Sequence, residues 1–250
     1  MTYSNVVLEV VAEGEGTPLV LLPSAGRDSY DLDSVAEEFA NQGFRVLRPQ
    51  PRGIGSSTGP TESITLHDYA ADVAAVIEHE KAGPAIVVGH AFGHYVARML
   101  DADRPDLVRG VVVAAGAERD FAPHLRAVIA DSANLELPEE ERLTALREGF
   151  FAPNSDPTAW LDGWHSDVKV QQLAASDQTD KDEWWAVAHA PILDLQAGAD
   201  PFRPDASRNE LKDRFPELVT VAVIPDTSHA LLPENPGAVV EEIVTWAESL

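Results

Sequence analysis

The sequence predicts an α/β protein with a doubly wound, mostly parallel sheet and a helical cap. Two observations lead to this prediction. Short apolar runs rich in β-branched residues alternate with helical patterns near both ends of the chain, as in sheets whose strands are joined by helices. A long central stretch instead has no strand-like run and reads as helices alone. A length of 250 residues suits one such domain.

The first half of the chain supplies four buried strands, an edge strand and the helices between them. An apolar run bounded by turn residues is typical of a strand covered on both faces, and apolar residues spaced three or four apart indicate a helix. We expect strands at 5–12, 18–22, 44–47, 85–88 and 109–115, and helices at 34–41, 66–80 and 93–102.

The pattern changes after the strand at 109–115. Three helical stretches follow, at 123–133, 138–150 and 157–174. Strand and helix alternation then returns at 191–196, 205–215, 218–224 and 236–250. Because the chain leaves the sheet and rejoins it, we expect one core made of 1–117 and 191–250, with 118–190 as a helical cap subdomain.

Composition limits the possible partners. The formal net charge is -24, and such a surface repels the phosphates of nucleic acids. The acidic surface is either an adaptation for solubility or a means of steering a cationic substrate. Cysteine is absent, which excludes disulfides and thiolate metal sites. We find no apolar membrane span and no secretory signal pattern, so we expect a cytoplasmic protein that binds a small-molecule substrate without membrane, nucleic acid or metal.

The segment Gly89-His90-Ala91-Phe92-Gly93 follows a β-branched strand and opens a helix. This arrangement is typical of a nucleophile elbow, where close approach of strand and helix leaves no room for flanking side chains. The turn directs the amide of Phe92 at a pocket, and the helix N-terminus adds positive potential there. Ala91 occupies the central position, where a nucleophile would stand.

Two further residues follow later strands in the order that a catalytic triad of this kind requires. Asp200 comes just after the strand at 191–196, and His229 follows the strand at 218–224. Either residue alone would be ordinary in a loop. Together they are candidates for a general base and its orienting acid, with Glu118 as the fallback acid.

These features resemble the α/β-hydrolase superfamily over essentially the whole chain. The segments that carry the resemblance are 18–22, 52–57, 89–93, 198–200 and 228–230. The resemblance implies an eight-stranded sheet, a cap between the sixth and seventh strands, chemistry without a cofactor, and an oxyanion hole of two backbone amides. By position these amides belong to Ala25 and Phe92. Ser24 departs from the usual glycine, and its hydroxyl either lines the pocket or stabilises the turn.

Ala91 leaves three explanations open, because a methyl group cannot attack a carbonyl. The protein is a natural enzyme in which His229 acts on water or substrate, a serine esterase or lactonase inactivated by a serine-to-alanine change, or a ligand-binding protein. The sequence favours a cofactor-independent enzyme acting on a small carbonyl compound such as an ester or lactone. Hydrolysis is the first expectation, and lyase or isomerase chemistry is the second.

Cap residues are expected to set specificity. Trp160 and Trp164 lie four residues apart and should share a helix face, with His165 beside them. Trp184 lies where the cap rejoins the core. We expect Ser24, Trp164, His165 and Trp184 to contact substrate, although aromatic residues at such positions also anchor a cap. His94, one turn beyond Ala91, either approaches the site or packs beneath the elbow.

Overall fold

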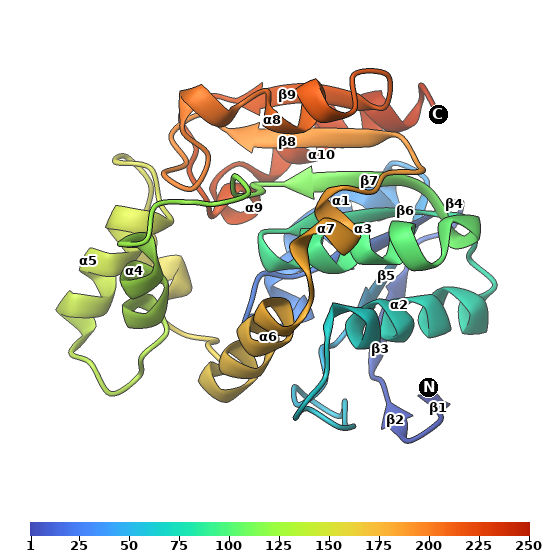
Figure 1. Cartoon of the computed structure of the whole chain (residues 1–250), viewed down its shortest axis with the longest axis horizontal. Coiled ribbons are helices and arrows are strands. Elements are labelled where there is room, and N and C mark those ends of the chain that lie inside the picture. The colour runs from blue at the N-terminus through green and yellow to red at the C-terminus, as the bar shows by residue number, and fades with distance from the viewer.

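The computed structural model describes all 250 residues. A seven-stranded sheet forms the centre of the molecule, with strand order β3-β5-β4-β6-β7-β8-β9 (Figure 1). All neighbouring strands run parallel except β3 and β5. The expected doubly wound, mostly parallel sheet is therefore confirmed. Its strands are β3 (Val10–Glu13), β4 (Thr17–Leu22), β5 (Phe44–Pro49), β6 (Ala85–His90), β7 (Val108–Ala114), β8 (Ile192–Ala197) and β9 (Val219–Ile224).

The sheet has seven strands and not the eight that the resemblance implied. The N-terminal strands β1 (Thr2–Tyr3) and β2 (Val6–Val7) form a separate antiparallel pair. The backbone of Val7 exchanges two hydrogen bonds with Thr58, at 2.9 and 2.8 Å. The hairpin is thus held by the loop after β5, and the single edge strand expected at 5–12 is divided into β2 and β3.

Helices cover both faces of the sheet and create two apolar cores. On one face lie α2 (Leu66–Glu80) and α3 (Phe92–Asp103), and on the other lie α1 (Asp33–Asn41) and α10 (Pro236–Ala247). Strands β4, β6 and β7 are apolar and buried on both faces because each face is covered in this way. Two short helices, α8 (Glu210–Arg214) and α9 (Leu231–Glu234), follow β8 and β9.

The cap lies between β7 and β8, beyond the carboxyl ends of the strands (Figure 1). It contains α4 (Leu125–Ser132), α5 (Glu139–Gly149), a 3-10 turn at Pro157–Trp160, α6 (Ser166–Gln178) and α7 (Lys181–Trp185). Strands β7 and β8 are direct parallel neighbours, so the inserted helices do not interrupt the sheet. Any side chain placed at those strand ends faces the underside of the cap.

The third cap helix is not the continuous helix expected at 157–174. The chain breaks at Gly163, which has a positive φ of 77°, and α6 begins only at Ser166. The guanidinium of Arg27 fills the space beside this glycine and donates a hydrogen bond to the carbonyl of Asp162. Trp160 and Trp164 therefore lie on either side of a bend. They still meet, with ring centroids 5.8 Å apart.

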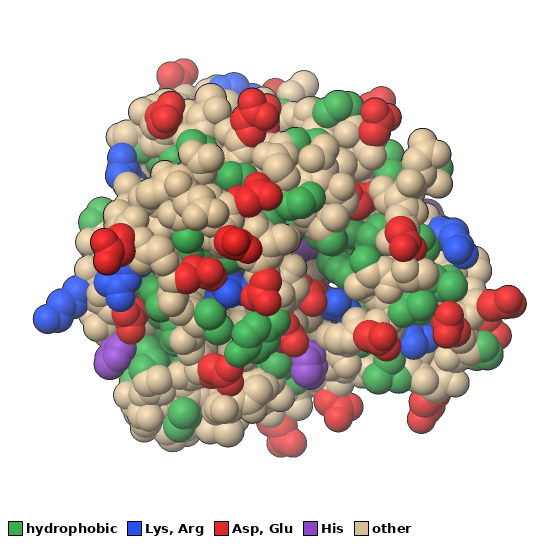
Figure 2. Space-filling view, turned by 180° about the vertical axis from the view of Figure 1, so that it is seen from behind, with side chains coloured by type: hydrophobic (Ala, Val, Ile, Leu, Met, Phe, Trp, Pro, Cys, Tyr) green, Lys and Arg blue, Asp and Glu red, His purple; other side chains and the backbone are tan.

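Acidic side chains are spread over the surface, and basic ones are fewer, on the face shown in Figure 2. No helix of the structure has the length and apolar character needed to span a bilayer.

Two glycines allow the elbow between β6 and α3 to approach its neighbours closely. A Cβ atom on Gly89 would lie 2.3 Å from the carbonyl carbon of Gly93. A Cβ atom on Gly93 would lie 2.5 Å from the carbonyl oxygen of Leu22 in β4. Both contacts are with backbone, which cannot rotate away. The expected role of the glycine frame is confirmed by this crowding.

We predict that Gly89→Ala lowers the free energy of unfolding by at least about 3 kcal/mol, because overpacking against backbone forces the strand and helix apart. Thermal unfolding should show a fall in Tm of about 6 °C or more. Gly237→Ala is the matched control, since a Cβ there meets nothing within 4 Å. Its Tm should stay the same or rise slightly, as alanine suits a helix better than glycine. Equal Tm values for both variants would contradict the packing argument.

Candidate active site

Ala91 stands at the sharp turn between β6 and α3. Its backbone has φ 46° and ψ -116°, a region that non-glycine residues rarely adopt. The amide of Ala91 donates to the carbonyl of Ala114 at the end of β7, at 3.0 Å, which fixes the turn to the sheet. Ala91 is 6% exposed and lines a cavity under the cap. The elbow geometry is therefore present, with a methyl group at its centre.

His229 and Asp200 form a hydrogen-bonded pair beside the elbow. The Nδ1 of His229 donates to Oδ2 of Asp200 at 2.9 Å, and the amide of Phe202 donates to Oδ1 of the same carboxylate at 2.8 Å. The ring of Phe202 packs on the imidazole, with centroids 4.4 Å apart. Both members of the pair are buried. Because Nδ1 is engaged by Asp200, Nε2 is the nitrogen of His229 that remains for chemistry in the cavity.

Asp200, and not the fallback Glu118, is the partner of His229. The amide of Glu118 donates to the carbonyl of Phe202, but its carboxylate makes no hydrogen bond to the imidazole. Glu118 is also absent from the cavity wall. The choice between these acids could not be made from spacing alone.

The amides of Ala25 and Phe92 have no hydrogen-bond acceptor within the protein. Phe92 is the first residue of α3, a position whose N–H has no intrahelical partner. Both residues line the cavity together with Ala91 and His229. Two unpaired donors beside a reacting centre can stabilise an oxyanion. The hydroxyl of Ser24 also lies in this wall and makes no hydrogen bond within the protein, so it lines the pocket.

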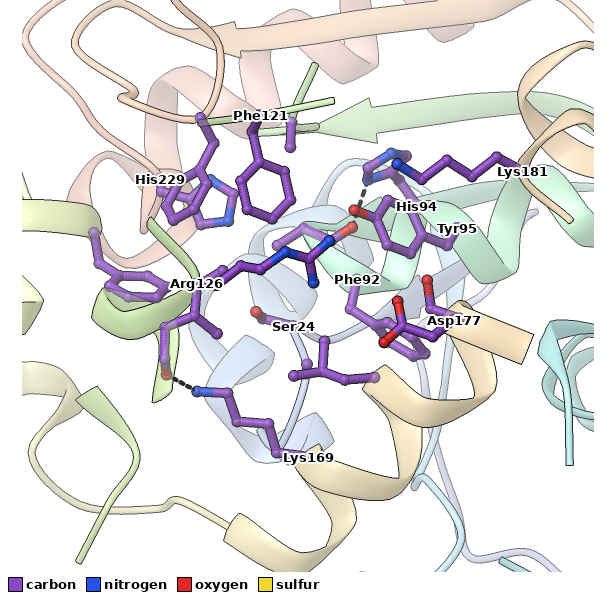
Figure 3. A pocket seen from close by; sticks show the side chains of 18 of the residues that line it. Ser24, Phe92, His94, Tyr95, Phe121, Arg126, Lys169, Asp177, Lys181 and His229 are labelled. Carbon is purple, nitrogen blue, oxygen red and sulfur yellow. Dashed lines mark hydrogen bonds between the residues drawn. The ribbon is translucent and has the colours of Figure 1, made fainter. Parts of the chain in front are cut away.

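The cavity is a small chamber of about 100 Å³ between the core and the cap. Eleven of its nineteen lining residues are hydrophobic, so most of its wall suits an apolar group. Figure 3 shows His229 and Phe121 on one side, Phe92 and Tyr95 on another, and Arg126 of the cap extending into the space between them. The lining includes residues from the turn after β4, from α3, and from the cap helices α4 and α6.

Two of the four residues expected to contact substrate lie outside the cavity wall. Ser24 and Trp164 line it, but His165 and Trp184 do not. His165 precedes α6, and its Nε2 lies 3.5 Å from a carboxylate oxygen of Asp28. Trp184 is buried behind the wall, where its ring lies 4.5 Å from the ring of Tyr95. The break in the third cap helix turns His165 away, and Trp184 supports the wall from behind.

His94 both packs beneath the elbow and reaches the cavity. Its Nδ1 bonds to the carbonyl of Ala91 at 2.5 Å, while its Nε2 has no partner. Burial, together with the charge of Arg98, holds the pKa of His94 well below its usual range. Burial also lowers the pKa of His90 to about 3. Both rings are therefore neutral at physiological pH, and His90 donates to the carbonyl of His229 at 2.8 Å.

Sequence reasoning missed several residues of the wall. Phe202 follows Asp200 by two positions and could have been found as the residue whose amide and ring hold the acid and the base. Phe121, Arg126, Phe150 and Lys169 come from the cap. Their positions depend on how the cap folds over the sheet, and no local motif marks them.

Comparison with known proteins agrees with the fold. The model of the alpha/beta hydrolase family matches residues 19–242. BpoC of Mycobacterium tuberculosis, described as a "Putative non-heme bromoperoxidase", is 28% identical over 244 residues, which cover 90% of this chain and 92% of BpoC. A non-heme haloperoxidase of Rhodococcus erythropolis is 24% identical over 94% of each chain.

Solved structures of other proteins have the same fold. The crystal structure of BpoC has a TM-score of 0.82 and 25% identity, covering 97% of this chain and 96% of that one. Est816, described as an N-acyl homoserine lactone degrading enzyme, has a TM-score of 0.78 at 22% identity, covering 97% of each chain. The family match spans most of the sheet, the turn at Ala91, and the two loops that carry Asp200 and His229. The chain therefore belongs to the alpha/beta hydrolase family and is a hydrolase-type enzyme.

Proposed function

We propose that the protein is a cofactor-independent hydrolase of a small carbonyl compound, such as an ester or lactone, in which His229 activates water. The observation that carries the proposal is the combination of a buried His229–Asp200 hydrogen bond and two unpaired oxyanion amides around a methyl group. These groups would supply a general base, an acid that orients it, and two hydrogen-bond donors for an oxyanion. Only the side chain that would form an acyl-enzyme is missing.

The reaction follows from these positions. Nε2 of His229 removes a proton from a water molecule as the water oxygen bonds to the carbonyl carbon. Asp200 stabilises the imidazolium, and the amides of Ala25 and Phe92 stabilise the oxyanion. The bond to the leaving oxygen then breaks, and His229 returns the proton to that oxygen. The products are an acid and an alcohol, joined in one molecule when the substrate is a lactone.

The mostly apolar lining of the cavity supports this chemistry, because apolar surroundings strengthen hydrogen bonds to a developing charge. One relative described as a hydrolase is consistent with the proposal. A 2-(acetamidomethylene)succinate hydrolase of Mesorhizobium japonicum is 28% identical over 51% of it.

A second candidate is a serine hydrolase whose nucleophile has been replaced by alanine. The strained backbone of Ala91 favours it, because this conformation presents the central side chain of the turn to the pocket, and a methyl group there has no chemical role. The elbow would then be retained for a hydroxyl that this chain lacks. The two candidates share His229 and Asp200 but differ in whether an acyl-enzyme can form.

We predict that His229→Ala lowers kcat/KM for phenyl acetate and γ-butyrolactone at least 100-fold, because general base catalysis is lost. Asp200→Asn should lower it by a similar factor, since the imidazole loses the carboxylate that orients it. His165→Ala is the matched control and should keep the activity of the unsubstituted protein, because this histidine lies outside the wall. Initial rates at saturating and limiting substrate measure the effect. Full activity in His229→Ala would remove this residue from the mechanism.

We predict that Ala91→Ser becomes labelled by a fluorophosphonate and gives a burst of p-nitrophenol from p-nitrophenyl acetate, because the new hydroxyl stands beside the His229–Asp200 pair. Mass spectrometry of the intact protein and stopped-flow absorbance measure these results. Steady turnover without a burst in the unsubstituted protein supports water attack. Turnover that appears only in Ala91→Ser supports the second candidate. Absence of turnover in both forms would contradict both hydrolytic proposals.

A further inference from the structure

We propose that the substrate carries a carboxylate, and that Arg126 and Lys169 of the cap bind it. This inference deepens the proposed function, on which it rests for the reacting carbonyl at the elbow. It assigns the substrate carboxylate to the other end of the same cavity. The substrate class is then a small monoanionic carbonyl compound with an apolar body between the carboxylate and the reacting bond.

The charge of the cavity wall is opposite to that of the chain. In the whole sequence 42 acidic residues stand against 18 lysines and arginines. Apart from histidine, the charged residues of the wall are Arg126, Lys169, Lys181 and the single acid Asp177. Three cations and one anion therefore line the cavity, although acidic residues are in excess in the chain as a whole. This distribution argues against a cationic substrate, which the acidic surface had left open.

Lys169 is a buried cation with few partners. It projects from α6 and is 5% exposed. Its ammonium group donates to the carbonyl of Ile129 and lies 4.6 Å from the ring centroid of Trp164, but it forms no ion pair. Burial and the charge of Arg27 lower the pKa of Lys169 to about 7. A carboxylate would supply the counter-charge and accept the N–H groups that Ile129 leaves free.

Arg126 approaches the same space from the facing helix α4. Its guanidinium makes no hydrogen bond and no ion pair within the protein, and lies 5.5 Å from the ring centroid of Phe121. Figure 3 shows Arg126 extending across the cavity, with Ser24 and Lys169 below it in that view. A planar guanidinium is suited to bind a carboxylate through two parallel hydrogen bonds. The exposed Arg126 and the buried Lys169 thus both line the cavity without an ion pair inside the protein.

The other charged groups of the wall fit the same assignment. The ammonium of Lys181 is already bonded to Asp120 at 2.9 Å and to the carbonyl of Arg119 at 2.6 Å. Lys181 is therefore a structural cation that happens to border the cavity. Asp177 is exposed and forms no ion pair. Its charge and that of Arg126 both act on Tyr95, so Asp177 offsets part of the attraction that Arg126 exerts on an anion. No carboxylate acts on Lys169 in this way.

Equilibrium binding of two matched ligands tests the proposal without requiring turnover. The probes are 4-phenylbutanoate and its neutral analogue 4-phenylbutanamide, measured by isothermal titration calorimetry at pH 6.5 in low salt. We expect the carboxylate to bind at least tenfold more tightly than the amide, because hydrogen bonds to a charged group are the stronger ones. Arg126→Met and Lys169→Met should each reduce this preference at least about fivefold.

Three further variants sharpen the test. Lys181→Met is the matched control and should keep the preference, because its charge is already paired. Asp177→Asn should keep or increase the preference. His229→Ala should also keep it, so loss of catalysis and loss of anion binding are separately visible.

Equal affinity for the two ligands, failure of both to bind at 10 mM, or a carboxylate preference that survives both Arg126→Met and Lys169→Met overturns the anion site. These outcomes leave the hydrolytic proposal to its own measurements. Circular dichroism spectra and Tm values for each variant identify a loss of binding that comes from misfolding, and Arg126→Lys provides a charge-retaining variant that should recover most of the preference.

Discussion

The active site depends on one close contact between backbones. Gly93, at the start of α3, lies against the carbonyl of Leu22 at the end of β4, and Gly89 lies against Gly93. This contact sets the turn that strains Ala91, opens the first amide of α3, and brings that amide beside the turn after β4, where Ala25 offers its own. The two unpaired amides in the cavity wall are thus a product of packing between β4, β6 and α3. Their positions do not depend on the side chain at residue 91.

The sequence predicted those parts of the fold that local patterns determine. The strands at β4, β6, β8 and β9 and the helix α2 lie where apolar runs and helical spacing indicated them. Strand order predicted Asp200 as the partner of His229 and left Glu118 as the alternative, and the structure pairs His229 with Asp200. The break at Gly163 was missed although the glycine is itself a local signal for a helix end, since it adopts a positive φ of 77° there. The contact of Arg27 with this bend is the part that the local sequence could not show.

Local sequence patterns were also insufficient to predict which residues line the cavity. Trp184 and His165 are ordinary candidates by residue type, yet tertiary packing places one behind the wall and the other beside Asp28. Lys169 is the reverse case, because it was not expected in the cavity wall and lies in it. A lysine on a polar cap helix reads as a surface residue, and its burial arises only when α6 closes over the core. Tertiary contacts decide which face of the cap packs against the core, and the spacing of residues in the sequence does not show it.

The cap is inserted between two hydrogen-bonded strands, and this position affects how the protein can evolve. Since β7 and β8 pair directly, the segment between them is covalently joined to the sheet only at its two ends. The elbow, Asp200 and His229 belong to one part of the chain, whereas Arg126 and Lys169 belong to the other. Recombination or drift within the cap can therefore alter which molecules are accepted while the reacting groups stay in register. Selection can act on choice of substrate and on bond-breaking almost independently.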